Sequence, residues 1–128
     1  MTDYIIKPDN KKTVVGIDVG GSTTKIVGFD SQKNIINPLI VKANDPVASS
    51  YGAFGKFTSE NNIGIDDIEK ILMTGVGSSF TEQGLFGIPT EHVTEFTAVG
   101  LGGLYLSGLD EAIIVSMGTG TAIVYAKK

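Results

Sequence analysis

Three runs of strand length, each rich in apolar residues, stand in the first third of the chain. The runs cover residues 13–19, 23–30 and 34–42, and the segments between them are rich in Gly, Ser, Asp and Asn. Short apolar runs bounded by such turn residues are typical of β-strands, and short connections join neighbouring strands in antiparallel order. We therefore expect an antiparallel meander of three strands after a flexible polar leader, residues 1–12.

The middle of the chain predicts helices that alternate with strands. Asp45 and Pro46 mark a helix start, because Asp caps the first amides and Pro suits the first helical position. This helix is expected to extend to about residue 62. Two further strands are expected at 70–74 and 91–94, and two further helices at 78–84 and 95–107. The last helix contains three glycines, which indicate close packing or a close backbone approach.

Two hairpins of the chain share one design. An apolar run, a turn of Gly, Ser and Thr, and a second apolar run occupy residues 14–27 and again 112–125. Glycine has no side chain and accepts positive φ, so such tips expose backbone amides that a polyphosphate can approach. The candidate phosphate-binding residues are Gly20, Gly21, Ser22, Thr23, Thr24 and Lys25 in the first turn, and Gly118, Thr119, Gly120 and Thr121 in the second.

Some candidate residues have a second interpretation. Thr24 fits equally well as a β-branched strand residue, and Lys25 as a solvated one. Asp18 ends an apolar strand before the first turn, where a carboxylate suits Mg²⁺ otherwise held by phosphate oxygens and water. Asp18 alone also fits a turn cap. Glu95 stands at a strand-to-helix junction, a place that the helix dipole favours for any acidic residue.

Composition argues against several classes of function. The 128 residues have a net charge of −4, and all 10 basic residues are lysine, so nucleic acid and anionic membranes are not expected as partners. There is no cysteine, so this chain supplies no disulfide, iron–sulfur ligand or cysteine-bound zinc. A signal peptide and a membrane-length apolar run are not visible, and we expect a soluble cytoplasmic protein.

The two turns and one further segment resemble a known superfamily. Residues 16–25 and 117–121 are similar to the two phosphate loops of actin-like ATPases, a group that includes sugar kinases, Hsp70 and actin. Within it, residues 94–103 and the strand and turn at 72–77 are similar to type II pantothenate kinases. The resemblance implies an α/β fold: a ribonuclease H-like lobe with a mixed five-stranded sheet, an antiparallel meander and flanking helices, and then the first hairpin of a second lobe. We expect these parts at 13–110 and 111–128.

That resemblance also implies a function: ATP-dependent phosphorylation of pantothenate to 4′-phosphopantothenate, the first step of coenzyme A biosynthesis, by a homodimer. Asp18 would lie near Mg²⁺, usually through water. The loop at 20–25 would bind the β- and γ-phosphates, and the loop at 118–121 the α- and β-phosphates. Glu95 would be the catalytic base that takes the proton from the pantothenate hydroxyl. Because further family motifs follow the second loop, we expect this chain to be an N-terminal fragment that is inactive alone.

Other interpretations stay open. Activators of 2-hydroxyacyl-CoA dehydratases resemble the chain in both loops, but they bridge a [4Fe–4S] cluster through cysteine, which this sequence lacks. Other actin-like sugar kinases would offer a catalytic Asn-Asp pair, and none stands near residues 90–110. A non-catalytic nucleotide-binding domain would bind ATP without turnover. His92 is the only histidine and is expected to be structural or incidental.

Overall fold

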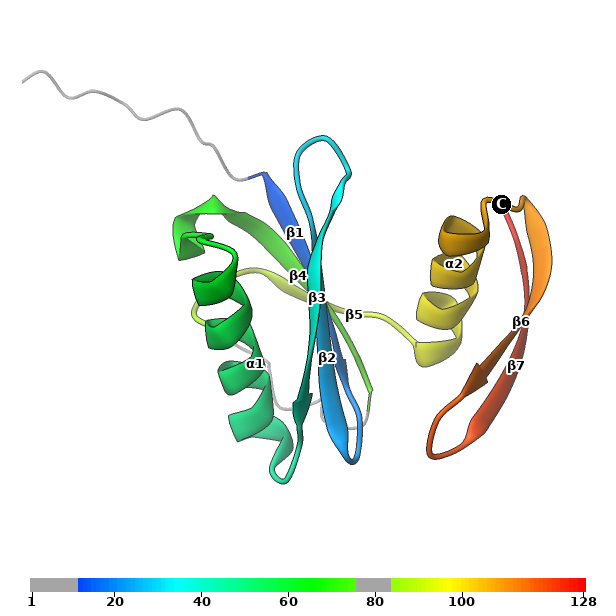
Figure 1. The fold of residues 1–128 in the computed structure, drawn as a ribbon, viewed down its shortest axis with the longest axis horizontal. Helices are drawn as coiled ribbons and strands as arrows, with labels where there is room; N and C mark the ends of the chain where they lie inside the picture. Colours follow the sequence, from blue (N-terminus) through cyan, green and yellow to red (C-terminus); the bar gives the residue numbers. More distant parts are fainter. Residues whose placement is uncertain (1–11, 76–83) are drawn as a thin grey trace, which may run out of the picture. The chain divides into compact units, whose positions relative to one another are not determined.

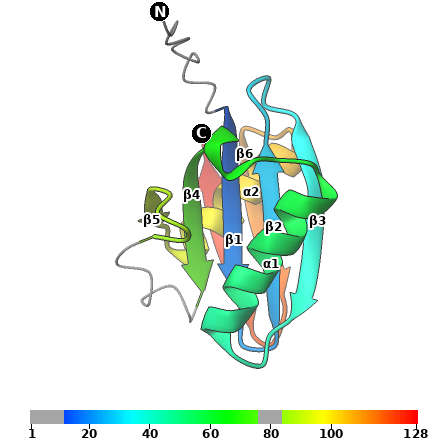
Figure 2. The ribbon, with the colours of Figure 1, turned by 90° about the vertical axis from the view of Figure 1, so that its left-hand side faces the viewer.

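The first of two compact units in the chain is built on a five-stranded sheet. The computed structural model describes residues 12–75 and 84–128, and the chain divides into the units Met1–Glu91 and His92–Lys128. The strands of the sheet are β1 (Thr13–Val19), β2 (Thr23–Phe29), β3 (Ile35–Lys42), β4 (Ile68–Gly75) and β5 (Thr90–His92). Figure 1 labels these strands, and Figure 2 shows that they lie in the order β3-β2-β1-β4-β5.

The pairing of these strands makes the sheet mixed. β1 is antiparallel to β2, and β2 is antiparallel to β3, which confirms the expected meander. β1 is parallel to β4, which the chain reaches only after crossing one face of the sheet through a helix. Parallel neighbours require such a crossover because a tight turn cannot join them.

Buried and half-exposed side chains alternate along β1, so one face of the sheet is buried. Val15, Ile17 and Val19 are buried, whereas the residues between them are half-exposed. α1 (Pro46–Glu60) covers the buried face, as Figure 2 shows, and adds Phe54 and Phe57 to the core. The period-two pattern of the strand and the apolar stripe of the helix therefore meet in one hydrophobic core.

Helix α1 begins and ends close to the positions expected. Asp45 is the N-cap, and its Oδ1 accepts a hydrogen bond from the Ala48 backbone N–H at 2.7 Å. Asn61 is the C-cap, so the helix ends slightly before residue 62. The following connector forms a short 3-10 helix, η1 (Ile65–Asp67), whose Asp67 Oδ2 accepts from the Gly64 N–H at 3.0 Å.

The second unit is one helix packed on one hairpin. It consists of α2 (Glu95–Ser107), β6 (Glu111–Met117) and β7 (Thr121–Lys127), with β6 antiparallel to β7. A Cβ on Gly100 would lie 3.2 Å from Ala126 Cβ, and one on Gly103 would lie 2.3 Å from Ile114 Cγ1. Gly100 and Gly103 therefore let the helix backbone approach the hairpin, which is the close packing that the sequence predicted.

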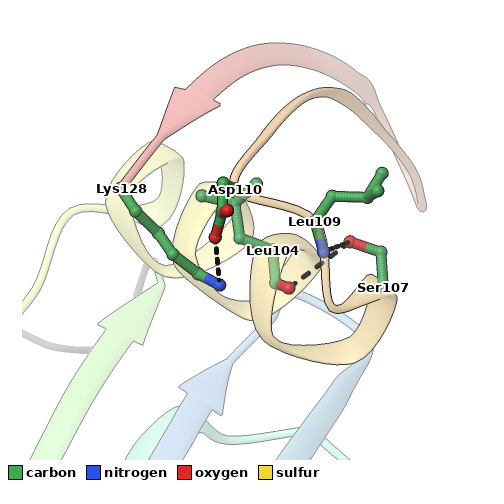
Figure 3. A network of polar contacts seen from close by, with 5 residues as sticks. All are labelled: Leu104, Ser107, Leu109, Asp110 and Lys128. Carbon is green, nitrogen blue, oxygen red and sulfur yellow. Dashed lines mark hydrogen bonds and ion pairs between the residues drawn. The ribbon is translucent and has the colours of Figure 1, made fainter.

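The C-terminal end of α2 is closed by a small polar network, shown in Figure 3. Ser107 Oγ donates to the Leu104 carbonyl at 3.4 Å and accepts from the Leu109 N–H at 3.3 Å. Gly108 is the C-cap in the left-handed region, with φ 70°. Lys128 Nζ pairs with Asp110 Oδ1 at 2.9 Å, so the far end of β7 is tied to the start of β6.

Two expectations are not decided by this structure. The helix expected at 78–84 lies outside the described residues except for Gly84. The expected lobe boundaries, 13–110 and 111–128, stay predictions. Within this chain, α2 packs in one compact unit with β6 and β7.

Candidate functional site

The first glycine-rich turn is a tight connection between β1 and β2. The Gly20 N–H donates to the Thr23 carbonyl at 2.9 Å, and a Cβ on Gly20 would lie 2.7 Å from that oxygen. Gly21 faces open space, since a Cβ there would meet nothing within 4 Å. The Ser22 carbonyl accepts from the Ala43 N–H at 2.9 Å, which ties the turn to the end of β3. The turn is therefore fixed at its base and open at its tip.

Asp18 and Lys25 face each other across this hairpin. They are direct partners in the antiparallel register of β1 and β2. Lys25 Nζ lies 3.2 Å from Asp18 Oδ2, with side-chain exposures of 54% and 38%. The carboxylate proposed from sequence as a metal ligand is thus already neutralised by a cation from the same loop.

The three hydroxyl residues of the turn lie in different surroundings. Ser22 is exposed and Thr23 half-exposed. Thr24 is fully buried, on the same side of β2 as Ile26, and its Oγ1 has no hydrogen-bond partner among the described residues. Ser22 and Thr23 are accessible to a ligand, whereas Thr24 points into the core. Its spacing of two from Ile26 is the sequence signal that could have revealed this.

A residue that the sequence analysis did not select lies beside Asp18. Thr74 of β4 is the register partner of Asp18 in the parallel pairing of β1 and β4. The Thr74 Oγ1 is buried, and no hydrogen-bond partner for it lies among the residues that the structure describes. Register partners present their side chains to one face of a sheet, so Lys25, Asp18 and Thr74 form one row across β2, β1 and β4. No local pattern in the sequence could have found Thr74, since the pairing joins distant strands.

The second glycine-rich turn is the tip of the β6–β7 hairpin. Met117 and Thr121 are the last register pair, and the Gly118 N–H donates to the Gly120 carbonyl at 2.8 Å. All residues from Gly118 to Thr121 are exposed. A Cβ on Gly120 would meet nothing within 4 Å, so the backbone at this tip is open to a ligand.

Glu95 occupies the first turn of α2. The helix N-cap is Thr94, whose Oγ1 accepts from the Thr97 N–H at 3.3 Å, and Glu95 is exposed beside it. From the contact of Gly103 with Ile114, about 12 Å of helix lead back to Glu95 and about 13 Å of strand lead to Gly118. Helix and strand run in opposite directions (Figure 1), so the start of α2, which is Glu95, and the hairpin tip lie at the same end of this unit.

The donor set of this chain fits a metal–nucleotide complex better than a metal ion alone. Among residues 12–75 and 84–128, no group of three or more His, Cys, Asp or Glu side chains is placed to hold a metal ion. Mg²⁺ in phosphotransferases is typically held by one or two carboxylates together with substrate phosphates and water. Asp18 stands beside an open glycine-rich turn and beside the Thr74 hydroxyl, which has no partner among the described residues, and this suits that arrangement. In the same two stretches, no helix is long and apolar enough to cross a membrane.

Comparison with known proteins identifies relatives by structure. No family model matches the sequence, and no curated protein matches it. Component A of (R)-2-hydroxyglutaryl-CoA dehydratase from Acidaminococcus fermentans is similar with a TM-score of 0.67 at 17% identity, over 86% of this chain and 44% of that one. The activator of 2-hydroxyisocaproyl-CoA dehydratase from Clostridium difficile, solved with bound ADPNP, has a TM-score of 0.61 at 12% identity, over 88% and 46%.

A protein assigned as a kinase is also similar, with a somewhat lower TM-score. A protein from Listeria monocytogenes assigned as an N-acetylmannosamine kinase has a TM-score of 0.57 at 15% identity, over 90% of this chain and 47% of that one. The chain therefore spans less than half the length of each of these three proteins. The TM-scores show a shared fold, and the chain has the α/β fold seen in actin-like ATPases and sugar kinases.

Proposed function

We propose that this chain is the phosphate-binding part of an ATP-dependent actin-like ATPase or phosphotransferase. The observation that carries the proposal is the first hairpin, in which an open glycine-rich tip stands beside the carboxylate of Asp18. The actin-like fold supports it, since one solved protein with this fold holds bound ADPNP.

Each group has a proposed task in phosphoryl transfer. The backbone amides of the turn at 20–23 bind the β- and γ-phosphates, and those at 118–121 bind the α- and β-phosphates. Asp18 holds Mg²⁺ through water. The metal, when bound, neutralises the phosphate charge that develops as the γ-phosphoryl group transfers. Amides, hydroxyls and lysine supply the remaining contacts that this chain makes, because it has no arginine.

The group that accepts the γ-phosphate decides between an ATPase and a pantothenate kinase. The structural comparisons support an ATPase more directly, because two of the similar proteins are a component or an activator of a 2-hydroxyacyl-CoA dehydratase. In that case water is the acceptor. Since the 128 residues contain no cysteine, any iron–sulfur ligand would have to come from another part of the protein.

Pantothenate is the second proposed acceptor, supported by the sequence of residues 94–103. In this proposal Glu95 takes the proton from the pantothenate hydroxyl as the γ-phosphate is attacked. The position of Glu95 agrees with such a role, because it is exposed at the same end of its unit as the turn at 118–121. A cytoplasmic homodimer is the form that this second proposal expects.

The test is ADP release by the full-length protein, with and without pantothenate, in wild type and in Glu95→Gln. Pantothenate-dependent release that falls by about 10²–10⁴-fold in Glu95→Gln would support the kinase and the catalytic base. Turnover that is independent of pantothenate would support the ATPase. ATP binding without any turnover would leave a nucleotide-binding domain. Glu69→Gln, which neutralises an exposed carboxylate on β4, is the matched control and should not change any rate.

A further inference from the structure

The ion pair of Lys25 with Asp18 is unusual in its location. Other exposed ion pairs in this chain join groups with no candidate role, such as Lys70 and Glu91 at 3.3 Å. Lys25 instead neutralises the one carboxylate that stands at the base of the first glycine-rich turn, at 3.2 Å. Its ammonium group thus occupies the place beside Asp18 that a metal ion would need.

Thr74 adds a second observation on the opposite side of Asp18. Its buried hydroxyl has no hydrogen-bond partner in the part of the chain that the structure describes, although buried hydroxyls are normally satisfied by protein or by ordered water. Neighbouring strands are about 4.8 Å apart, so the side chains of Thr74 and Asp18 lie next to each other as register partners. The row of Lys25, Asp18 and Thr74 therefore offers a cation on one side of the carboxylate and an unused donor on the other.

We propose that Lys25 is an internal counter-ion of the nucleotide site. Without nucleotide, Lys25 holds Asp18 and keeps a free divalent cation from binding there. When a metal–nucleotide complex binds, Lys25 leaves Asp18 and pairs with a phosphate oxygen, and Asp18 is free to hold the hydrated metal with the help of Thr74. This inference rests on the proposed phosphate-binding role of the turn at 20–23.

The proposed exchange predicts that loss of the Lys25 charge changes two affinities in opposite directions. Removing the ammonium group should strengthen the binding of a free divalent cation at Asp18, because the carboxylate loses its competing partner. The same change should weaken the binding of the metal–nucleotide complex, because a phosphate loses its cation. A lysine that only stabilises the hairpin would weaken both. Exposed ion pairs are weak, so the gain for the free cation is about 1.5- to fivefold in Kd.

The experiment is a Mn²⁺ titration of the full-length protein, in which the EPR signal of free Mn²⁺ reports how much is unbound. It compares wild type, Lys25→Met and Lys25→Arg, each with and without Asp18→Asn, so that binding at other carboxylates is subtracted. Lys70→Met is the matched control, because it removes a lysine from an ion pair of similar length that has no candidate role in nucleotide binding. The same proteins are then titrated with ATP at saturating Mn²⁺.

Tighter Mn²⁺ binding in Lys25→Met that depends on Asp18, together with about tenfold weaker ATP binding, supports the counter-ion role. Lys25→Arg should resemble wild type in the Mn²⁺ titration because it keeps the charge. Unchanged or weaker Mn²⁺ binding in Lys25→Met, or an equal gain in Lys70→Met, overturns the inference. Failure of wild type to bind ATP contradicts the proposed function instead, while the Mn²⁺ titration without nucleotide still decides whether Lys25 competes for Asp18.

Discussion

Gly103 of α2 lies so close to Ile114 of β6 that a Cβ on the glycine would stand 2.3 Å from Ile114 Cγ1 and 3.0 Å from Cγ2. Both carbon atoms are bonded to Cβ of Ile114, and the χ1 rotamers of a β-branched side chain are restricted. Gly103→Ala should therefore destabilise the second unit by about 1–3 kcal/mol. The opening free energy from hydrogen exchange of amides in β6 and β7 would measure this.

The neighbouring glycine provides the control for that substitution. A Cβ on Gly102 would meet nothing within 4 Å. Gly102→Ala should stabilise the helix by about 0.5–1 kcal/mol, because alanine restricts the unfolded backbone more than glycine does. Equal effects of the two substitutions would show that α2 does not pack on β6 through Gly103.

The first glycine-rich turn allows stability and ligand binding to be separated. A Cβ on Gly20 would collide with the Thr23 carbonyl at 2.7 Å, whereas Gly21 faces open space. Gly20→Ala should distort the turn and destabilise the first unit. Gly21→Ala should change its free energy of unfolding by less than about 0.5 kcal/mol, yet weaken ATP binding about tenfold if phosphate approaches the backbone there. Thermal unfolding and ATP titration of both variants give the comparison, and normal ATP affinity in Gly21→Ala would contradict a phosphate contact at this position.

Local patterns were sufficient for most of the elements. β1 matched its expected range of 13–19, because an apolar run ends there at the glycines of the turn. α1 began as expected, because Asp45 and Pro46 specify a helix start chemically. The Asp18–Lys25 pairing also follows from local information, since a turn at Gly20–Ser22 fixes the register of the hairpin.

Long-range features were beyond the reach of those patterns. The pairing of Asp18 with Thr74 joins strands that are separated by the whole α1 crossover, and parallel register leaves no mark on a single strand. The tight contact of Gly103 with Ile114 was foreseen only as close packing, because sequence cannot name the partner of a glycine. Thr24 lies two residues before the buried Ile26, and this spacing places both side chains on the same face of β2. The polar residues on either side of Thr24 made it look like part of an exposed turn.

Asp30 should make the stability of the first unit depend on pH. Hydrogen bonds from the backbone and side chain of Asn34, and then from the Gln32 backbone, hold the pKa of Asp30 below its usual value. A lowered pKa in the folded state means that the carboxylate stabilises the turn above the unfolded pKa, and that this contribution is lost as pH falls through the folded pKa. Asp30→Asn should therefore lower Tm at pH 7, with a difference from wild type that shrinks below about pH 4.

A control for that pH dependence is available on the same unit. Asp66→Asn removes an exposed carboxylate from η1, and it should leave the shape of the Tm–pH curve almost unchanged. Thermal unfolding of the three proteins between pH 2 and pH 8 is the measurement. A difference between wild type and Asp30→Asn that stays constant across this range would show that the charge of Asp30 does not stabilise the turn.

The two faces of the β6–β7 hairpin should respond differently to the same chemical change in the 128-residue chain. Val115 and Ile123 are cross-strand partners with exposures of 51% and 71%, whereas Ile114 and Val124 form the adjacent pair that contacts the glycines of α2. Threonine keeps the β-branched shape, so Val115→Thr/Ile123→Thr should change stability by less than about 0.5 kcal/mol and reduce self-association. Ile114→Thr/Val124→Thr should destabilise the unit by about 2 kcal/mol or more, because hydroxyls would replace packed methyl groups. Hydrogen exchange and light scattering test both effects, and a loss of stability in the first double variant would reveal that the outer face is covered in solution.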